Sequence, residues 1–247
     1  MPETLALLFF AHVLADYVLQ TRRMVETKDK GATLALHFLI VLGSLLLIFG
    51  QWDAPALYLL ALSHIFIDTI KVQLFDDRFR AHILDQIAHI ATLLITAALA
   101  PTLWADAPLA PLTWLPESAL LLAGLLYATR AGGFAVGKLM EPFSPELTRQ
   151  SLPGGGQMIG ILERGLIFGL MIAGLPAGIG FLIAAKSVLR FETIQSGGED
   201  DSRQMAEYVI IGTLASFAWA LAVSMGTLAL LHSLLGLPLL EIIRPSA

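Results

Sequence analysis

The sequence contains no cysteine, and only 14% of its 247 residues are charged. The absence of cysteine excludes disulfide bonds and thiolate metal sites. Soluble domains usually carry about 25% charged residues, so the scarcity of charge argues against a soluble protein. The net charge of −5 is modest and says little about partners. No nucleic-acid partner is expected.

Hydrophobic residues make up 56% of the chain, and the mean hydropathy is +0.75. Apolar runs of nearly bilayer length recur along the whole sequence, which indicates an integral membrane protein. These runs are too long for barrel strands, so the sequence predicts an all-α, polytopic membrane helical bundle. The N-terminus lacks the basic region of a signal peptide, and we expect the first helix to be retained. About eight transmembrane helices are predicted, over 3–20, 33–49, 55–74, 81–100, 117–138, 157–173, 176–190 and 205–235.

Lysine and arginine are distributed unequally between the two predicted sides of the membrane. Of the 15 basic residues, 14 lie in the loops after the first, third, fifth and seventh helices or at the helix ends facing them. The positive-inside rule makes these loops cytoplasmic, so both termini are expected outside. Trp52, Trp104 and Trp114 would then lie at the outer interface, where tryptophan is favoured.

The pattern H-x3-D-x20-H occurs twice, with an offset of 52 residues. The first copy comprises His12, Asp16 and His37, and the second comprises His64, Asp68 and His89. A spacing of four puts each histidine and aspartate on one helix face. We therefore predict a parallel repeat of two helical hairpins, about 5–50 and 57–102. Together they form a metal-site half, 1–100, which 101–247 completes as one integrated membrane domain.

The predicted topology places these six residues and Asp85 at one depth in the membrane. A charge near the centre of a membrane helix costs about 2.5–3.5 kcal/mol on insertion scales, so such residues need partners. Imidazole and carboxylate together suit zinc, manganese or iron. Seven donors exceed the needs of one tetrahedral ion, so two divalent ions are expected. The predicted metal ligands are His12, Asp16, His37, His64, Asp68, Asp85 and His89.

Separate hydrogen bonds between helices, or a water-filled path lined by these residues, are the competing interpretation of the same pattern. His82 does not fit the repeat, and we expect it to be solvated at the membrane interface. The segment 195–203 is rich in charge, which predicts a mobile loop.

Charged residues of the C-terminal half lie at the same predicted depth as the histidines. Arg164 and Arg190, with Lys71, could hold a phosphate against the metal ions. The alternatives are snorkelling to the interface and an internal ion pair between Glu163 and Arg164. We expect Arg164 to point toward the histidines and aspartates, and Glu163 to point elsewhere. The candidate catalytic residues are Lys71, Glu163, Arg164, Arg190 and Glu207.

Several of these motifs resemble those of an uncharacterised family of bacterial integral membrane proteins. They are H-V-L-A-D-Y-V-L-Q, the isolated His37, H-I-F-I-D-T-I-K, D-Q-I-A-H, G-I-L-E-R, K-S-V-L-R-F and E-Y-V-I-I-G-T-L-A-S-F. The resemblance covers nearly the whole chain and implies a location in the bacterial inner membrane. Residues 5–95 also resemble, more distantly, the LexA-regulated membrane-bound metal-dependent hydrolases. That second resemblance implies a hydrolase by analogy.

Three functions fit these observations. The first is a metal-dependent membrane hydrolase that acts on a phosphate-containing lipid from the cytoplasmic side. The second is a transporter of a metal ion, protons or an anion, with the repeat as its moving unit. The third is a non-catalytic membrane partner or sensor that docks through 195–203. Polar residues are few in the outer halves of the helices, so we expect the site to open to the cytoplasm only, which favours the enzyme or the sensor. Membrane lipid is the expected partner, and the oligomeric state stays open.

Overall fold

The computed structural model describes residues 1–75, 78–143, 154–194 and 199–237, and for 188–194 and 199–202 it describes the backbone only. These residues form helices, turns and connecting segments, without a strand among them. They divide into two compact units. Unit 1 covers Met1–Leu126 together with 229–237, and unit 2 covers Tyr127–Leu228.

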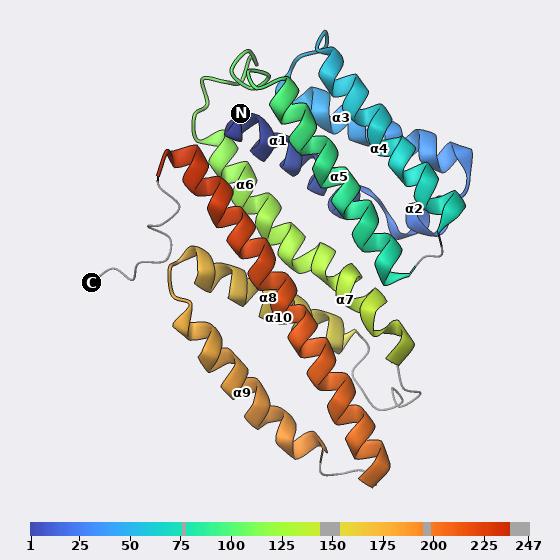
Figure 1. The fold of residues 1–247 in the computed structure, drawn as a ribbon, viewed down its shortest axis with the longest axis vertical. Coiled ribbons are helices and arrows are strands. Elements are labelled where there is room, and N and C mark those ends of the chain that lie inside the picture. The colour runs from blue at the N-terminus through green and yellow to red at the C-terminus, as the bar shows by residue number, and fades with distance from the viewer. Residues whose placement is uncertain (76–77, 144–153, 195–198, 238–247) are drawn as a thin grey trace. The chain divides into compact units, whose positions relative to one another are not determined.

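Four long helices of unit 1 pack in a closed ring. They are α1 (Pro2–Leu14), which continues as the π-helical turn η1 (Ala15–Leu19), α3 (Gly31–Phe49), α4 (Pro55–Leu74) and α5 (Phe79–Leu99). α1 contacts α3 and α5, α3 contacts α4, and α4 contacts α5 (Figure 1). Exchanging the hairpin α1/α3 with the hairpin α4/α5 leaves this set of contacts unchanged, as a two-fold repeat requires.

Local sequence explains where these helices begin and end. Pro2 and Pro55 lie in the first turns of α1 and α4, where the missing N–H costs nothing. Gly50 ends α3 with φ 64°, a left-handed conformation that glycine adopts without a steric penalty. Between α1 and α3, the short helix α2 (Arg22–Glu26) is capped by Thr21, whose side chain accepts a hydrogen bond from the Met24 N–H.

One end of unit 1 is closed by the segment that follows α5. Thr4 donates from Oγ1 to the Pro101 carbonyl and accepts from the Trp104 N–H, at 3.2 and 3.3 Å. The Trp104 ring packs edge-on against Phe49, with centroids 6.3 Å apart. Trp104 is therefore part of the core of unit 1, and its depth in the membrane stays a prediction. Helix α6 (Leu115–Leu126) then packs along α1, so unit 1 contains more than the four helices of the repeat.

Unit 2 contains the π-helical turn η2 (Tyr127–Ala131), α7 (Gly132–Met140), the 3-10 turn η3 (Glu141–Phe143), α8 (Gly155–Ile172), α9 (Ala177–Ile194) and most of α10 (Glu199–Leu235). Its apolar core joins α8, α9 and α10 through Ile167, Ile179, Phe217 and Ala220. Helix α10 begins at Glu199, so the prediction of a loop over 195–203 is wrong for residues 199–203. The acidic sequence at 199–201 favours a helix N-terminus because of the helix dipole. Residues 195–198 lie outside the described residues.

The fold is an all-α membrane bundle, as the hydropathy predicts. Among the described residues, seven helical stretches are long and apolar enough to cross a membrane. They are Pro2–Leu19, Gly31–Phe49, Pro55–Leu74, Phe79–Leu99, Leu115–Phe143, Gly155–Ile172 and Arg203–Leu235. The expected span over 176–190 corresponds to α9, which is apolar over the shorter stretch Ala177–Ser187.

The orientation of the chain in the membrane stays a prediction, and it is open to a direct test. The sequence has no cysteine, so single cysteines can be placed at Asp29 and Trp114, which are both exposed. We expect a membrane-impermeant maleimide to label Trp114→Cys in intact cells and to leave Asp29→Cys unlabelled until the cells are permeabilised. Labelling of Asp29→Cys from outside would reverse the proposed orientation.

Candidate metal centre

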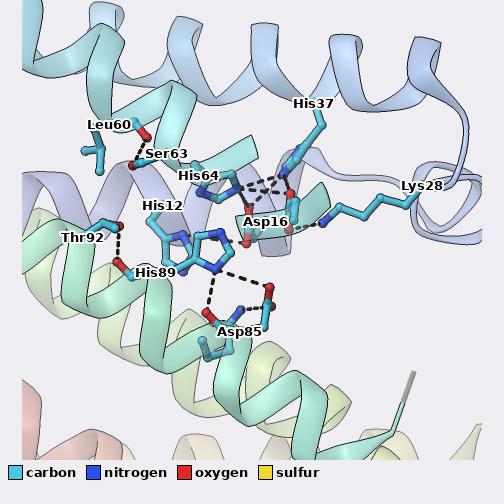
Figure 2. Close-up of polar contacts among 12 residues, drawn as sticks. His12, Asp16, Lys28, His37, Leu60, Ser63, His64, Asp85, His89 and Thr92 are labelled. Carbon is cyan, nitrogen blue, oxygen red and sulfur yellow. Dashed lines mark hydrogen bonds and ion pairs between the residues drawn. The ribbon is translucent and has the colours of Figure 1, made fainter. Parts of the chain in front are cut away.

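Side chains from all four ring helices of unit 1 meet inside the ring (Figure 2). The seven predicted metal ligands are all among them, and at most 8% of any of these side chains is exposed. Helical spacing and membrane depth together predict this convergence. The depth was inferred from the positions of lysine and arginine alone. We call these seven residues the His/Asp cluster.

Two histidines and two aspartates form the centre of the His/Asp cluster. His37 Nε2 and His64 Nε2 are 3.1 Å apart, and each is 3.2 Å from Asp16 Oδ1. Asp68 Oδ2 is 3.4 Å from His37 Nε2 and 3.6 Å from His64 Nε2. Around a tetrahedral ion with bonds of roughly 2.0–2.2 Å, neighbouring donor atoms are about 3.3–3.6 Å apart. The spacing of these donors therefore matches a tetrahedral transition-metal site, and these groups could hold an ion.

Asp16 reaches this centre from the π-helical turn η1. The turn is closed by a hydrogen bond from the Gln20 N–H to the Ala15 carbonyl, at 3.0 Å. Such single π turns are rare and are frequent at functional sites. His12, one turn earlier, keeps its Nδ1 3.8 Å from Asp16 Oδ2. The matching part of the second repeat, around His64 and Asp68, is regular α-helix, so the two copies differ in structure here.

A second possible site lies beside the first and uses Asp68, Asp85 and His89. His89 Nδ1 is 2.9 Å from the Asp85 carbonyl oxygen. A carbonyl only accepts, so Nδ1 carries the proton and Nε2 keeps its lone pair. Nε2 has no hydrogen-bond partner among the described residues. An imidazole whose other nitrogen donates to a carbonyl is the usual form of a metal-bound histidine.

The four histidine rings of the cluster lie against one another. The His64 and His89 ring centroids are 4.1 Å apart, and His12 lies 5.6 Å from His64 and 5.2 Å from His89. The His12 and His89 rings are stacked. A separation of more than about 12 Å between His12 and His64 would count against the metal prediction, because ligand bonds of roughly 2.0–2.2 Å cannot span such a gap. Their ring centroids are 5.6 Å apart, so the structure does not contradict the prediction in this way.

Two lysines pair with carboxylates of the cluster. Lys28 Nζ is 2.7 Å from Asp68 Oδ1, and Lys71 Nζ is 3.0 Å from Asp85 Oδ2. Lys71 was expected near the metal ligands, whereas Lys28 was not. With neutral histidines, three carboxylates and two ammonium groups give the cluster a net charge of −1. One divalent ion would raise this net charge to +1, and two would raise it to +3.

Lys28 stays charged despite its burial. Burial alone would lower the pKa of Lys28, but the nearby carboxylates of Asp68 and Asp16 raise this pKa above its ordinary value. A lysine whose pKa is raised by folding adds stability at every pH below its ordinary pKa. That stability is lost only as the pH rises through the raised value, which is strongly alkaline. Over the neutral range Lys28 is thus a fixed positive charge on Asp68.

The structure also describes His82 and several candidate catalytic residues of the C-terminal half. His82 is buried, so the expectation that it is solvated is wrong. Glu163 pairs with Lys186 at 2.6 Å, and Glu207 pairs with Arg203 on the exposed surface at 3.3 Å. Arg190 belongs to α9, and its side chain lies outside the described residues.

Arg164 is held by neutral oxygen atoms in unit 2. Its Nε and Nη2 donate to the Thr129 carbonyl at 3.2 and 3.0 Å, and Nη1 donates to Ser216 Oγ at 3.0 Å. Thr129 lies in the π turn η2. A second carbonyl of that turn, that of Tyr127, accepts from Trp219 Nε1 at 3.1 Å. The turn therefore offers backbone oxygens to side chains of α8 and α10. Whether Arg164 also faces the His/Asp cluster stays a prediction.

Glycines make the space for the Arg164 guanidinium, which gives a matched pair of substitutions within α8. A Cβ at Gly160 would lie 2.9 Å from Arg164 Nη1, whereas a Cβ at Gly169 would meet nothing within 4 Å. The guanidinium would have to move, which weakens its hydrogen bonds to Thr129 and Ser216, so we expect Gly160→Ala to destabilise the protein by about 0.5–1.5 kcal/mol. Gly169→Ala should stabilise it by about 0.5–1 kcal/mol. Thermal unfolding in detergent measures both, and equal effects at the two positions would contradict this role for Gly160.

Comparison with known proteins adds one match. Residues 4–110 match a family model described as a protein of unknown function (DUF3307). The match covers less than half of the chain, yet it contains the whole His/Asp cluster and both of its lysines. No curated protein and no solved structure matches the chain.

Proposed function

We propose that this protein is an integral-membrane hydrolase that uses two divalent metal ions to cleave a phosphate ester of a lipid or a similar amphiphilic substrate. The proposal rests on five short contacts among four donor atoms, each between 3.1 and 3.6 Å long. The four atoms are His37 Nε2, His64 Nε2, Asp16 Oδ1 and Asp68 Oδ2. Nitrogen and carboxylate donors at this spacing suit zinc, manganese or iron.

Two ions have separate donors in this arrangement. Asp16, His37 and His64 would hold the first ion, and Asp85 and His89 would hold the second. Asp68 belongs to a candidate group with each set, so its carboxylate would serve either ion.

The charge of the centre supports an anionic substrate. Two divalent ions would raise the net charge of −1 to +3, in a place where no side chain of the cluster is more than 8% exposed. Unbalanced charge is expensive in such surroundings. A phosphate group would supply the missing negative charge.

His12 was predicted to be a ligand and belongs to a candidate metal group with Asp16 and His64. Because Asp16, His37 and His64 would already hold the first ion, we assign His12 as the proton acceptor instead. The bound ions would lower the pKa of water and stabilise the leaving oxygen. His12 takes a proton from the attacking water, with Asp16 Oδ2 3.8 Å from its Nδ1. The water oxygen forms a bond to phosphorus while the ester P–O bond breaks. The leaving alkoxide then receives the proton from His12.

The test separates metal binding from chemistry. The purified chain in lipid nanodiscs is loaded with zinc, manganese or ferrous ion, and phosphate release from phosphatidic acid is measured with and without chelator. We expect metal-dependent release that His12→Gln abolishes while the metal content stays near two ions. His232→Ala, in α10, serves as the control and should leave both unchanged.

Two results would contradict this proposal, the first its function and the second its mechanism. One is a fully loaded protein that hydrolyses neither phosphomonoester nor phosphodiester lipids with any of the three metals. The other is a His12→Gln variant with wild-type activity, which would remove the assigned proton acceptor.

A further inference from the structure

A cavity of about 820 Å³ opens between α4 and α5 of unit 1. It is lined by these two helices and by the segments that follow α3 and α5. Polar residues are few in the predicted outer halves of the helices, and we therefore expected the cluster to open to the cytoplasm only. The cavity lies between these outer halves of α4 and α5, and Ser63, Thr92 and Thr96 provide polar groups on its wall.

The mouth of the cavity is acidic. Asp53 and Asp106 line it, from the segments that connect α3 to α4 and α5 to α6. The sequence has no lysine or arginine in 50–54 or 100–114. Neither carboxylate forms an ion pair with a residue that the structure describes. A cleft lined by one sign of charge raises the local concentration of the opposite ion, so this mouth attracts cations.

The cavity ends short of the His/Asp cluster, none of whose residues lines it, but some of its lining residues precede or follow cluster histidines along α4 and α5. On α5, Thr96, Thr92 and His89 follow one another at spacings of four and three residues, which keeps them along one face of the helix. Thr92 Oγ1 donates to the His89 carbonyl at 2.7 Å. On α4, Ser63 Oγ donates at 2.8 Å to the carbonyl of Leu60, which also lines the cavity and lies four residues before His64 (Figure 2). Each hydroxyl oxygen can still accept a hydrogen bond from water or coordinate a cation.

We infer that this cavity is the vestibule through which a hydrated divalent cation reaches His89 and His64. The inference rests on the metal centre of the proposed function but not on hydrolysis. At about 30 Å³ per water, the volume holds roughly 25 waters, ample for an ion with its hydration shell. An anion would find no positive group in the lining.

The experiment measures how fast metal enters. The metal-free full-length chain in nanodiscs is mixed rapidly with zinc or manganese, and both the rate of loading and the final content are recorded. We expect the Asp53→Asn/Asp106→Asn protein to load roughly 10-fold more slowly at low salt, because it lacks the electrostatic attraction. Its final content should equal that of the wild type. Asp29→Asn, at an exposed carboxylate outside the cavity, should load at the wild-type rate.

A plug in the cavity gives a second arm. Thr96→Cys, in a chain that has no other cysteine, is treated with a bulky, water-soluble disulfide-forming reagent. Loading should slow at least 10-fold and recover after reduction. Wild-type loading by the plugged protein, or by the double asparagine variant at low salt, would overturn the vestibule. A cysteine that the reagent cannot reach would show an apolar occupant and overturn it too. A protein that binds no metal at equilibrium would instead remove the metal centre itself.

Discussion

His64→Ala is expected to remove tightly bound metal from the protein. His64 Nε2 lies 3.1 Å from His37 Nε2 and 3.2 Å from Asp16 Oδ1, and its ring is 4.1 Å from that of His89. No other side chain of the cluster is so central. Loss of a partner that only orients a ligand lowers metal affinity by about 10–100-fold. Loss of a ligand should therefore lower the affinity by more than the upper end of that range.

Elemental analysis and calorimetric titration with zinc measure this loss directly. His232→Ala is the control, because it removes a histidine from unit 1 that is no part of the cluster. Thermal unfolding adds a second readout. A metal at a free concentration of about 1,000 times its dissociation constant stabilises a protein by about 4 kcal/mol, and His64→Ala should lose that increment. A variant that retains wild-type metal content, or wild-type stabilisation by zinc, would contradict the assigned centre.

The helices and the His/Asp cluster could be predicted because their determinants are local. Hydropathy locates the spans, and prolines and Gly50 mark helix ends. The spacing of four residues fixes which face a histidine and an aspartate share. The repeat then requires the two hairpins to pack symmetrically, which brings the polar faces together. Each of these steps needs only residues that are near one another in the sequence.

What could not be predicted depends on contacts between distant residues. Lys28 looks like Arg22, Arg23 and Lys30 in the sequence, and only the folded ring shows that it reaches Asp68, 40 residues away. The π turns at 15–19 and 127–131 carry no sequence signal that we can identify. Arg164 was predicted to point toward the His/Asp cluster. Its observed partners are a carbonyl of such a turn and Ser216.

Lys28→Met should destabilise the metal-free protein by about 3–5 kcal/mol, the usual cost of removing one partner from a buried ion pair. Asp68 is 1% exposed, and Lys28 Nζ lies 2.7 Å from its Oδ1. Methionine keeps most of the length of the lysine stem, so the change removes mainly the charge. Without Lys28, the Asp68 carboxylate is left beside Asp16 with too little positive charge to balance it.

Metal should reverse most of this loss, because an ion bound to Asp68 supplies the missing positive charge. Unfolding of wild-type and Lys28→Met proteins is therefore measured in chelator and in excess zinc. Lys30→Met, two residues away and exposed, should change stability by less than about 0.5 kcal/mol in either condition. A Lys28→Met defect of equal size with and without zinc would mean that Asp68 binds no ion. No defect at all would mean that the Lys28–Asp68 pair adds nothing to the stability of the ring.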